Sequence, residues 1–154
     1  ISTPSMWHLN IHAIDATFPL FSGTDGHGLI PLHPWTRPKD IRTNIQALRA
    51  DAPWLLHTFR PDRRVELYAE WSPLFWKAED DGLLRATPDG FGWDWSFADS
   101  GTAEVVAVVG SLMNRIQSTR RDLGAQLFEA VLDIWDAGLP SEERRKAYLK
   151  INPR

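Results

Sequence analysis

The strongest constraint on the fold is an apolar stripe in the last third of the chain. Between residues 102 and 137, apolar residues recur every three, four or seven positions, which is typical of one face of an α-helix. A single helix over this range would be about 50 Å long at 1.5 Å per residue. Arg115, Arg120 and Arg121 suit the negative end of one helix, and Asp122 suits the start of another. We therefore favour two helices, with one long helix as the alternative. The stripe consists of Val105, Val109, Leu112, Ile116, Leu123, Leu127, Val131 and Ile134.

The end of the chain carries signals for one further helix. Gly138 and Pro140 are expected to end the preceding helix, because glycine tolerates the left-handed conformation that follows a helix and proline cannot continue one. Ser141, followed by Glu142 and Glu143, is expected to cap a short last helix.

Residues 6–98 differ from this helical part because they are rich in proline, glycine, histidine and aromatic residues. Several short segments alternate between apolar and polar residues, which predicts strands with one buried face. Thr36 is expected to cap a helix that begins at Pro38 and ends before Pro53. The predicted strands are residues 7–13, 54–59, 65–71, 83–86 and 93–97.

Together these segments predict an α+β fold. We expect an N-terminal strand–helix unit followed by an antiparallel β-meander, packed against two or three C-terminal helices. The sequence has no internal repeat and no Ser/Gly linker, so residues 6–152 are expected to form a single domain. Because the chain opens with Ile1 rather than methionine, we expect residues 1–5 to be an added segment and Met6 to be the natural start.

The composition narrows the class of partner. The net charge is −3 and the isoelectric point is about 5.9, which argues against a nucleic-acid partner because such proteins are usually basic. The absence of cysteine excludes disulfides, thiolate nucleophiles and cysteine-ligated zinc. It also fits a reducing compartment, so a cytoplasmic location is expected. No segment approaches the ~20 apolar residues of a membrane span, so no membrane partner is expected.

Tryptophan is in excess. Seven of the eight tryptophans lie at or before Trp95. They are interpreted either as an aromatic-rich sheet core or, in part, as a contact surface, where tryptophan is enriched.

All five histidines lie within the first 57 residues, which raises the question of a metal site. His8 and His12 lie on the polar side of the predicted first strand. Four residues of a strand span about 13 Å at ~3.3 Å each. Metal–nitrogen bonds of about 2.1 Å cannot cover that distance from both rings to one ion. The two rings therefore cannot share one ion, although each could still pair with His27, Asp25 or His57. We predict no metal site and no cofactor.

The loop over residues 19–37 is a second candidate site. His27 lies between Gly26 and Gly28, which let a backbone approach a ligand closely. The segment is not a dinucleotide-binding fingerprint, because the third glycine and the strand-to-helix setting are missing. It is interpreted either as a flexible surface loop or as a contact or active-site loop.

The third candidate is the polar face of the predicted sheet. Glu66, Tyr68 and Glu70 share the outward face of one predicted strand, and Asp94 would join them from another. Such a face suits recognition of a basic partner surface, and it is equally compatible with plain exposure to solvent.

Two functional hypotheses follow. The first is a small protein-binding module without catalytic activity, such as an inhibitor, an antitoxin, an immunity-type protein or a non-catalytic subunit. Its partner would be another protein. The alternative is a small hydrolase or isomerase in which histidine acts as general acid or base. A homodimer through the C-terminal helices is compatible with both. The binding candidates are Trp35, Tyr68, Glu66, Glu70, Asp94 and His33, and the catalytic candidates are His27, His12, His8 and Asp25.

Overall fold

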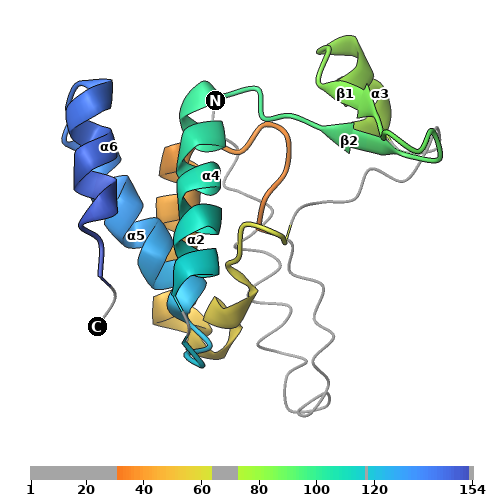
Figure 1. Ribbon diagram of the computed structural model, residues 1–154. Helices are drawn as coiled ribbons and strands as arrows, with labels where there is room; N and C mark the ends of the chain where they lie inside the picture. The colour runs from red at the N-terminus through yellow and green to blue at the C-terminus, as the bar shows by residue number, and fades with distance from the viewer. Residues whose placement is uncertain (1–30, 64–72, 117, 153–154) are drawn as a thin grey trace, which may run out of the picture.

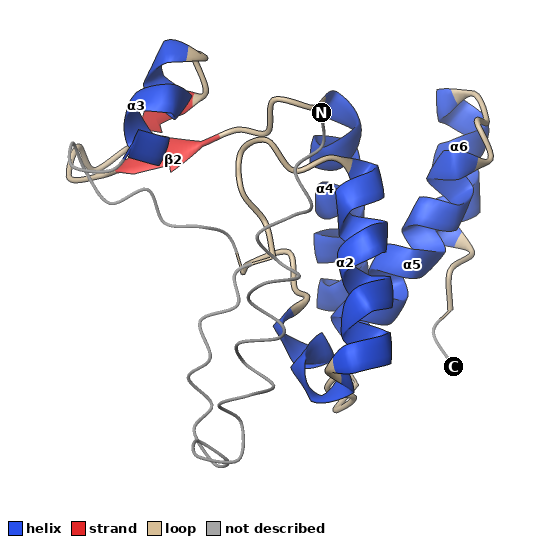
Figure 2. Ribbon diagram, turned by 180° about the vertical axis from the view of Figure 1, so that it is seen from behind, coloured by secondary structure: helices blue, strands red, loops and turns tan. Residues whose placement is uncertain are grey.

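The structure of the chain is a computed structural model, in which residues 31–63, 73–116 and 118–152 are described. The described part consists of a helical bundle and a smaller unit to one side of it (Figures 1 and 2). The smaller unit combines one helix with a two-stranded antiparallel sheet. The predicted α+β class is therefore confirmed, with helices as the larger component. No helix in the described ranges is long and apolar enough to cross a membrane.

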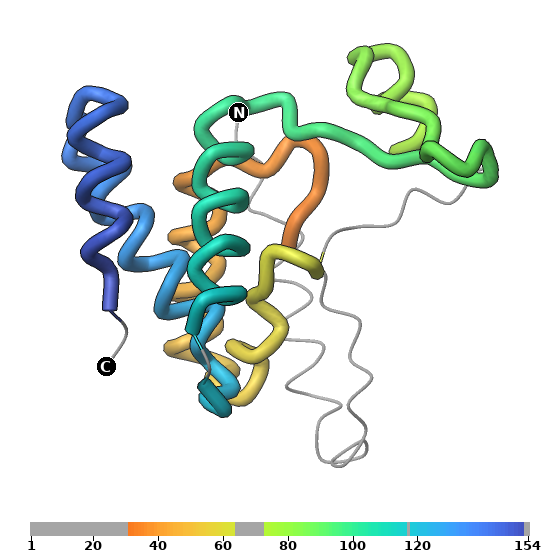
Figure 3. Tube along the Cα trace, in the orientation of Figure 1, coloured from red at the N-terminus to blue at the C-terminus, as the bar shows by residue number. Residues whose placement is uncertain are grey.

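The bundle is organised around one central helix, α5. Helices α2 and α6 and the 3₁₀ helix η1 all contact α5, and so does α4 (Figure 3). The bounds of these elements are α2 (Pro38–Asp51), η1 (Pro53–Thr58), α4 (Ser100–Arg115), α5 (Leu123–Asp136) and α6 (Ser141–Leu149).

The predicted break in the C-terminal stripe is confirmed. Helix α4 ends at Arg115 and α5 begins at Leu123, so Arg120 and Arg121 lie between the two helices. Gly138 has a φ of 66°, which is the left-handed conformation expected just beyond a helix.

Two capping predictions are wrong by one residue. The N-cap position of α2 is occupied by Arg37 rather than Thr36. The N-cap position of α6 is occupied by Pro140, and Ser141 is the first residue of the helix. The backbone N–H of Arg37 donates to the carboxylate of Asp40, three residues into the helix, at 2.9 Å, which is the contact that the third residue of a helix makes in a capping box. The Thr36 hydroxyl instead accepts the backbone N–H of His33 at 2.9 Å. Thr36 is buried instead.

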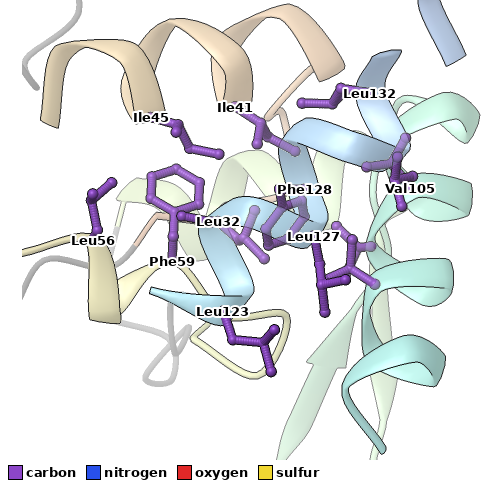
Figure 4. Close-up of a cluster of buried hydrophobic side chains, with 14 of the residues drawn as sticks. Leu32, Ile41, Ile45, Leu56, Phe59, Val105, Leu123, Leu127, Phe128 and Leu132 are labelled. Atoms are coloured by element: carbon purple, nitrogen blue, oxygen red, sulfur yellow. The ribbon is translucent and has the colours of Figure 1, made fainter. Parts of the chain in front are cut away.

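The bundle encloses one large apolar cluster, shown in Figure 4. The rings of Phe59 and Phe128 meet edge to face in it, with their centroids 5.8 Å apart. At the start of α5, a Cβ atom added to Gly124 would overlap the Phe59 carbonyl oxygen. The close approach of α5 to η1 therefore requires glycine. The labelled members of the cluster are Leu32, Ile41, Ile45, Leu56, Phe59, Val105, Leu123, Leu127, Phe128 and Leu132.

Helix α6 is joined to the bundle by one polar cluster. Arg144 donates two hydrogen bonds to the Glu104 carboxylate, at 2.6 and 2.8 Å, and its guanidinium lies 4.6 Å from the centroid of the Trp135 ring. The Tyr148 hydroxyl donates to the same carboxylate at 3.2 Å. The bonds from Arg144 hold the pKa of Glu104 below its usual value. Burial and the charge of Glu104 raise the pKa of Tyr148 to about 12.

The smaller unit, hereafter the helix–hairpin unit, consists of α3 (Pro73–Asp80), β1 (Leu84–Ala86) and β2 (Trp93–Trp95). Leu84 pairs with Trp95, and Ala86 pairs with Trp93. Phe75 and Ala78 of α3 are buried with Trp95 in a second apolar cluster, separate from that of the bundle. The strands predicted at 83–86 and 93–97 are thus confirmed with narrower bounds, and they pack on α3, a helix that the sequence did not predict.

The strand predicted at 54–59 is wrong, because these residues lie mainly in η1. Pro53 begins a 3₁₀ turn, and the Phe59 N–H donates to the Leu56 carbonyl at 3.1 Å. A short apolar run does not by itself distinguish a buried strand from a buried helical turn. The strands predicted at 7–13 and 65–71 lie outside the described residues.

Candidate functional site

Three of the predicted binding residues lie in the described ranges. His33 and Trp35 are neighbours whose ring centroids are 6.2 Å apart. Asp94 lies opposite Arg85 in the hairpin, on the face away from Trp93 and Trp95, because side chains alternate along a strand. The packing of Trp35 against the Trp95 cluster places it on the other face of the hairpin. The remaining predicted residues lie outside the described ranges: Glu66, Tyr68, Glu70, His8, His12, Asp25 and His27.

Trp35 connects the segment before α2 to the helix–hairpin unit. Its Nε1–H donates to Asp81 at 2.7 Å, and the Lys77 ammonium lies 4.8 Å from the centroid of its ring. Lys77 also pairs with Asp81 at 2.7 Å. Hydrogen bonds from Lys77 and Trp35 lower the pKa of Asp81, so this carboxylate stays ionised. In this structure Trp35 therefore serves the packing of the unit, and its role in binding stays a prediction.

The two described histidines both make local hydrogen bonds. The His33 Nδ1 accepts the Trp35 backbone N–H at 3.2 Å, and burial lowers the pKa of His33, which favours this neutral acceptor. The His57 Nδ1 donates to the Trp54 carbonyl at 2.7 Å. Among the described residues, no three His, Asp or Glu side chains lie close enough to hold a metal ion. The acid/base hypothesis depends on histidines outside these ranges and stays a prediction.

The most distinctive surface in the described chain is aromatic. Trp76, Phe91 and Trp93 are 49%, 94% and 46% exposed, and we call these three residues the aromatic surface. The ring of Phe75 contacts both tryptophans edge to face, with its centroid 5.7 Å from that of Trp76 and 5.8 Å from that of Trp93. Leu74, at 43% exposed, precedes Phe75 in α3.

The small size of the unit explains this exposure. Helix α3 has eight residues and buries Phe75 and Ala78, which lie three positions apart on its inner face. Trp76 does not lie on that face, and its side chain is exposed to solvent. In β2, Trp95 is buried while Trp93, two residues earlier on the same side of the strand, is only partly covered. A three-residue strand beside a two-turn helix cannot enclose both indoles.

The hairpin turn holds the backbone of Phe91 in a defined conformation. The Thr87 N–H donates to the Gly92 carbonyl at 2.9 Å, and the Thr87 hydroxyl accepts the Gly92 N–H at 3.0 Å. Asp89 accepts hydrogen bonds from the Thr87 hydroxyl and the Phe91 N–H, which lower the pKa of Asp89. Gly90 has a φ of 75°, a value that side-chain-bearing residues rarely adopt. The backbone beneath Phe91 is thus fixed by its own hydrogen bonds.

The helix–hairpin unit is also acidic. Between residues 73 and 95 the chain has five acidic residues and two basic ones, Lys77 and Arg85. Lys77 is already engaged by Asp81 and Trp35. The aromatic surface is therefore set in negative surroundings.

Comparison with protein-family models, with curated protein sequences and with solved structures gives no significant match to this chain. Sequence reasoning missed α3, for which Pro73 at a helix start was an available signal.

Proposed function

We propose that this protein is a protein-binding module without catalytic activity of its own, in the manner of an inhibitor, an antitoxin, an immunity-type protein or a non-catalytic subunit. It would dock its partner through the aromatic surface. The observation that carries the proposal is the exposure of Trp76, Phe91 and Trp93 on one small unit. Water contact with large aromatic rings is unfavourable, and a partner that covers them would gain most of their transfer free energy.

The properties of these residues fit binding hot spots. Tryptophan is strongly enriched at the interface positions where truncation to alanine costs the most binding free energy. Such residues contribute more to affinity when they are already ordered before the partner binds. The backbone at Phe91 meets the second condition, because the bonds made by Thr87 and Asp89 define the turn that carries the ring. The edge-to-face contacts of Phe75 similarly restrict Trp76 and Trp93.

A photo-crosslinking experiment tests the proposal. A benzophenone side chain is placed at position 91 of the full chain, and the crosslinked products are identified after irradiation in native lysate. The matched control carries the same group at position 149, since Leu149 is also a large exposed apolar residue, at 66%, but lies on α6.

We expect one predominant protein adduct from position 91, and we expect Trp76→Ala in the same chain to reduce it strongly. The same adduct pattern from positions 91 and 149, or no protein adduct from position 91, would overturn the proposal. Turnover of a small-molecule substrate by the purified chain would also overturn it and would favour the hydrolase or isomerase alternative.

A further inference from the structure

The outer face of α3 combines an exposed indole with two carboxylates. Glu79 and Asp80 lie three and four positions after Trp76, so all three side chains share one face of the helix. All three are exposed. Neither carboxylate forms an ion pair with another residue in the part of the chain that the structure describes, whereas Asp81 next to them is bound by Lys77 and Trp35.

The position of these carboxylates is unfavourable for the helix itself. Glu79 and Asp80 lie in the last turn of α3, where the helix dipole is negative and where a cation is the stabilising choice. They also adjoin Asp81, so like charges are close together. Among the described residues neither charge is paired within the fold, and an external cation would relieve both repulsions.

An indole face beside carboxylates is a good receptor for a guanidinium or ammonium group. A cation over tryptophan is attracted by the negative face of the ring, and arginine adds planar stacking and bidentate hydrogen bonds to carboxylates. Such an arrangement already exists where Trp35 meets the helix–hairpin unit, because Lys77 lies over the Trp35 ring and pairs with Asp81.

We propose that the partner of the aromatic surface is a basic protein segment, and that one of its arginine or lysine side chains lies over Trp76 and pairs with Glu79 and Asp80. This inference rests on the proposed function and specifies the chemistry of the partner. Charge complementarity supports a basic protein over a nucleic acid, because the surroundings of the surface are acidic and would repel phosphate. Asp89, next to the exposed Phe91, extends the negative charge to the hairpin turn.

The test uses two synthetic peptides that differ only in charge. One is a capped nine-residue peptide of alternating arginine and leucine. The other has citrulline, which is nearly isosteric but neutral, at every arginine position. Each is titrated into the ¹⁵N-labelled full chain, and the indole N–H signals are followed by NMR. The signals of Trp76 and Trp93 are assigned with Trp76→Phe and Trp93→Phe variants.

We expect the arginine peptide to shift the Trp76 indole signal and to bind about threefold to tenfold more tightly than the citrulline peptide, as expected for one exposed cation–aromatic contact with a carboxylate pair. Raising the salt concentration should reduce this preference, because exposed charges are screened. Glu79→Gln with Asp80→Asn should abolish the preference without destabilising α3, since both changes remove repulsion in its last turn.

The matched control is Asp51→Asn with Glu143→Gln, which changes the net charge equally at two exposed carboxylates on α2 and α6. It should keep the preference for arginine. Equal binding of the two peptides, or a preference that survives in the Glu79/Asp80 variant, would overturn the inference. That result is distinguishable from failure of the proposed function, because the position-91 crosslink to a protein would still form.

Discussion

The helical bundle and the helix–hairpin unit differ in how far they bury their apolar residues. The bundle gathers nineteen buried residues into one cluster, whereas the unit buries three. Six large apolar side chains are exposed in the described chain, and four of them lie in the unit: Leu74, Trp76, Phe91 and Trp93. Since apolar burial is the main source of folding free energy, the bundle carries most of the stability. The unit instead presents aromatic side chains to solvent.

The contrast teaches that residue type alone does not determine the role of an aromatic ring here. Phe128 in the bundle is fully buried, and Phe91 in the hairpin turn is almost fully exposed. The same substitution at these two positions should therefore have opposite consequences for folding and for binding.

Phe128→Ala is expected to change the free energy of unfolding more than any other substitution considered below. It removes a ring from the centre of the bundle and leaves a cavity beside Phe59. Substitutions of this kind cost about 3–5 kcal/mol of unfolding free energy. Urea unfolding followed by circular dichroism measures the loss. A loss below about 1 kcal/mol would contradict the central role given to this cluster.

Gly124→Ala should destabilise the bundle by about 1–3 kcal/mol, because the new methyl group forces α5 away from η1. The control is Gly110→Ala in α4, where the nearest atom to an added Cβ lies 3.8 Å away in Pro61. That change should stabilise the protein by about 0.5–1 kcal/mol, the usual advantage of alanine over glycine within a helix. Similar thermal shifts for both variants would show that the close approach at Gly124 is not the cause.

Trp95→Ala tests whether the helix–hairpin unit unfolds independently of the bundle. Trp95 is the largest member of the unit's small cluster, so its removal should open the unit locally while the bundle stays folded. Hydrogen exchange should become about 100-fold faster for the amides of β1 and β2. The amides of α4 and α5 should keep their rates. Uniform acceleration across both regions would mean that they unfold as one cooperative unit.

The polar cluster that holds α6 predicts a pH dependence within the bundle. The pKa of Glu104 is lowered in the folded protein, so its contribution is present above the unfolded value of about 4.5 and is lost as the pH falls through the lower folded value. We expect Glu104→Gln to reduce the unfolding free energy at pH 7 by about 0.5–1 kcal/mol, a modest figure because the carboxylate is partly exposed. Once the pH lies below the folded pKa of Glu104, the two proteins should be equally stable. A difference that grows toward low pH would have the wrong sign for this cluster.

The smallest effect on folding is expected for Phe91→Ala. Because the ring is 94% exposed, the unfolding free energy should change by less than about 0.5 kcal/mol. Binding of the crosslinked partner should nevertheless fall markedly. A clear loss of thermal stability in this variant would show that Phe91 contributes to packing and would weaken its assignment to a contact surface.

The sequence predicted the bundle better than the unit for a physical reason. The stripe from Val105 to Ile134 extends over many helical turns, so its period is unambiguous, and the basic residues near Arg120 marked its interruption. Helix α3 buries only Phe75 and Ala78, and two residues do not establish a period. The apolar run 54–59 was equally ambiguous between a strand and a helical turn, and tertiary contacts decided it.

The candidate site was harder to predict because exposure is a tertiary property. Trp76 and Trp95 are the same residue type within twenty positions of each other, yet one is exposed and the other buried. Only the packing of α3 on a three-residue strand distinguishes them. Trp35, predicted as a binding residue, makes internal bonds to Asp81 and Lys77 that no local sequence pattern indicates.

The segment from His33 to Thr36 has a mechanical consequence. It is hydrogen-bonded to the first turn of α4, where Thr102 donates to the Thr36 carbonyl at 2.7 Å, and to the strand exit, where the Ala98 N–H donates to the Pro34 carbonyl at 2.8 Å. Through Trp35 the same four residues are also bonded to the end of α3. A force applied to the helix–hairpin unit would thus be transmitted through these hydrogen bonds to the N-terminus of α4. It would not be absorbed by extension of a flexible linker.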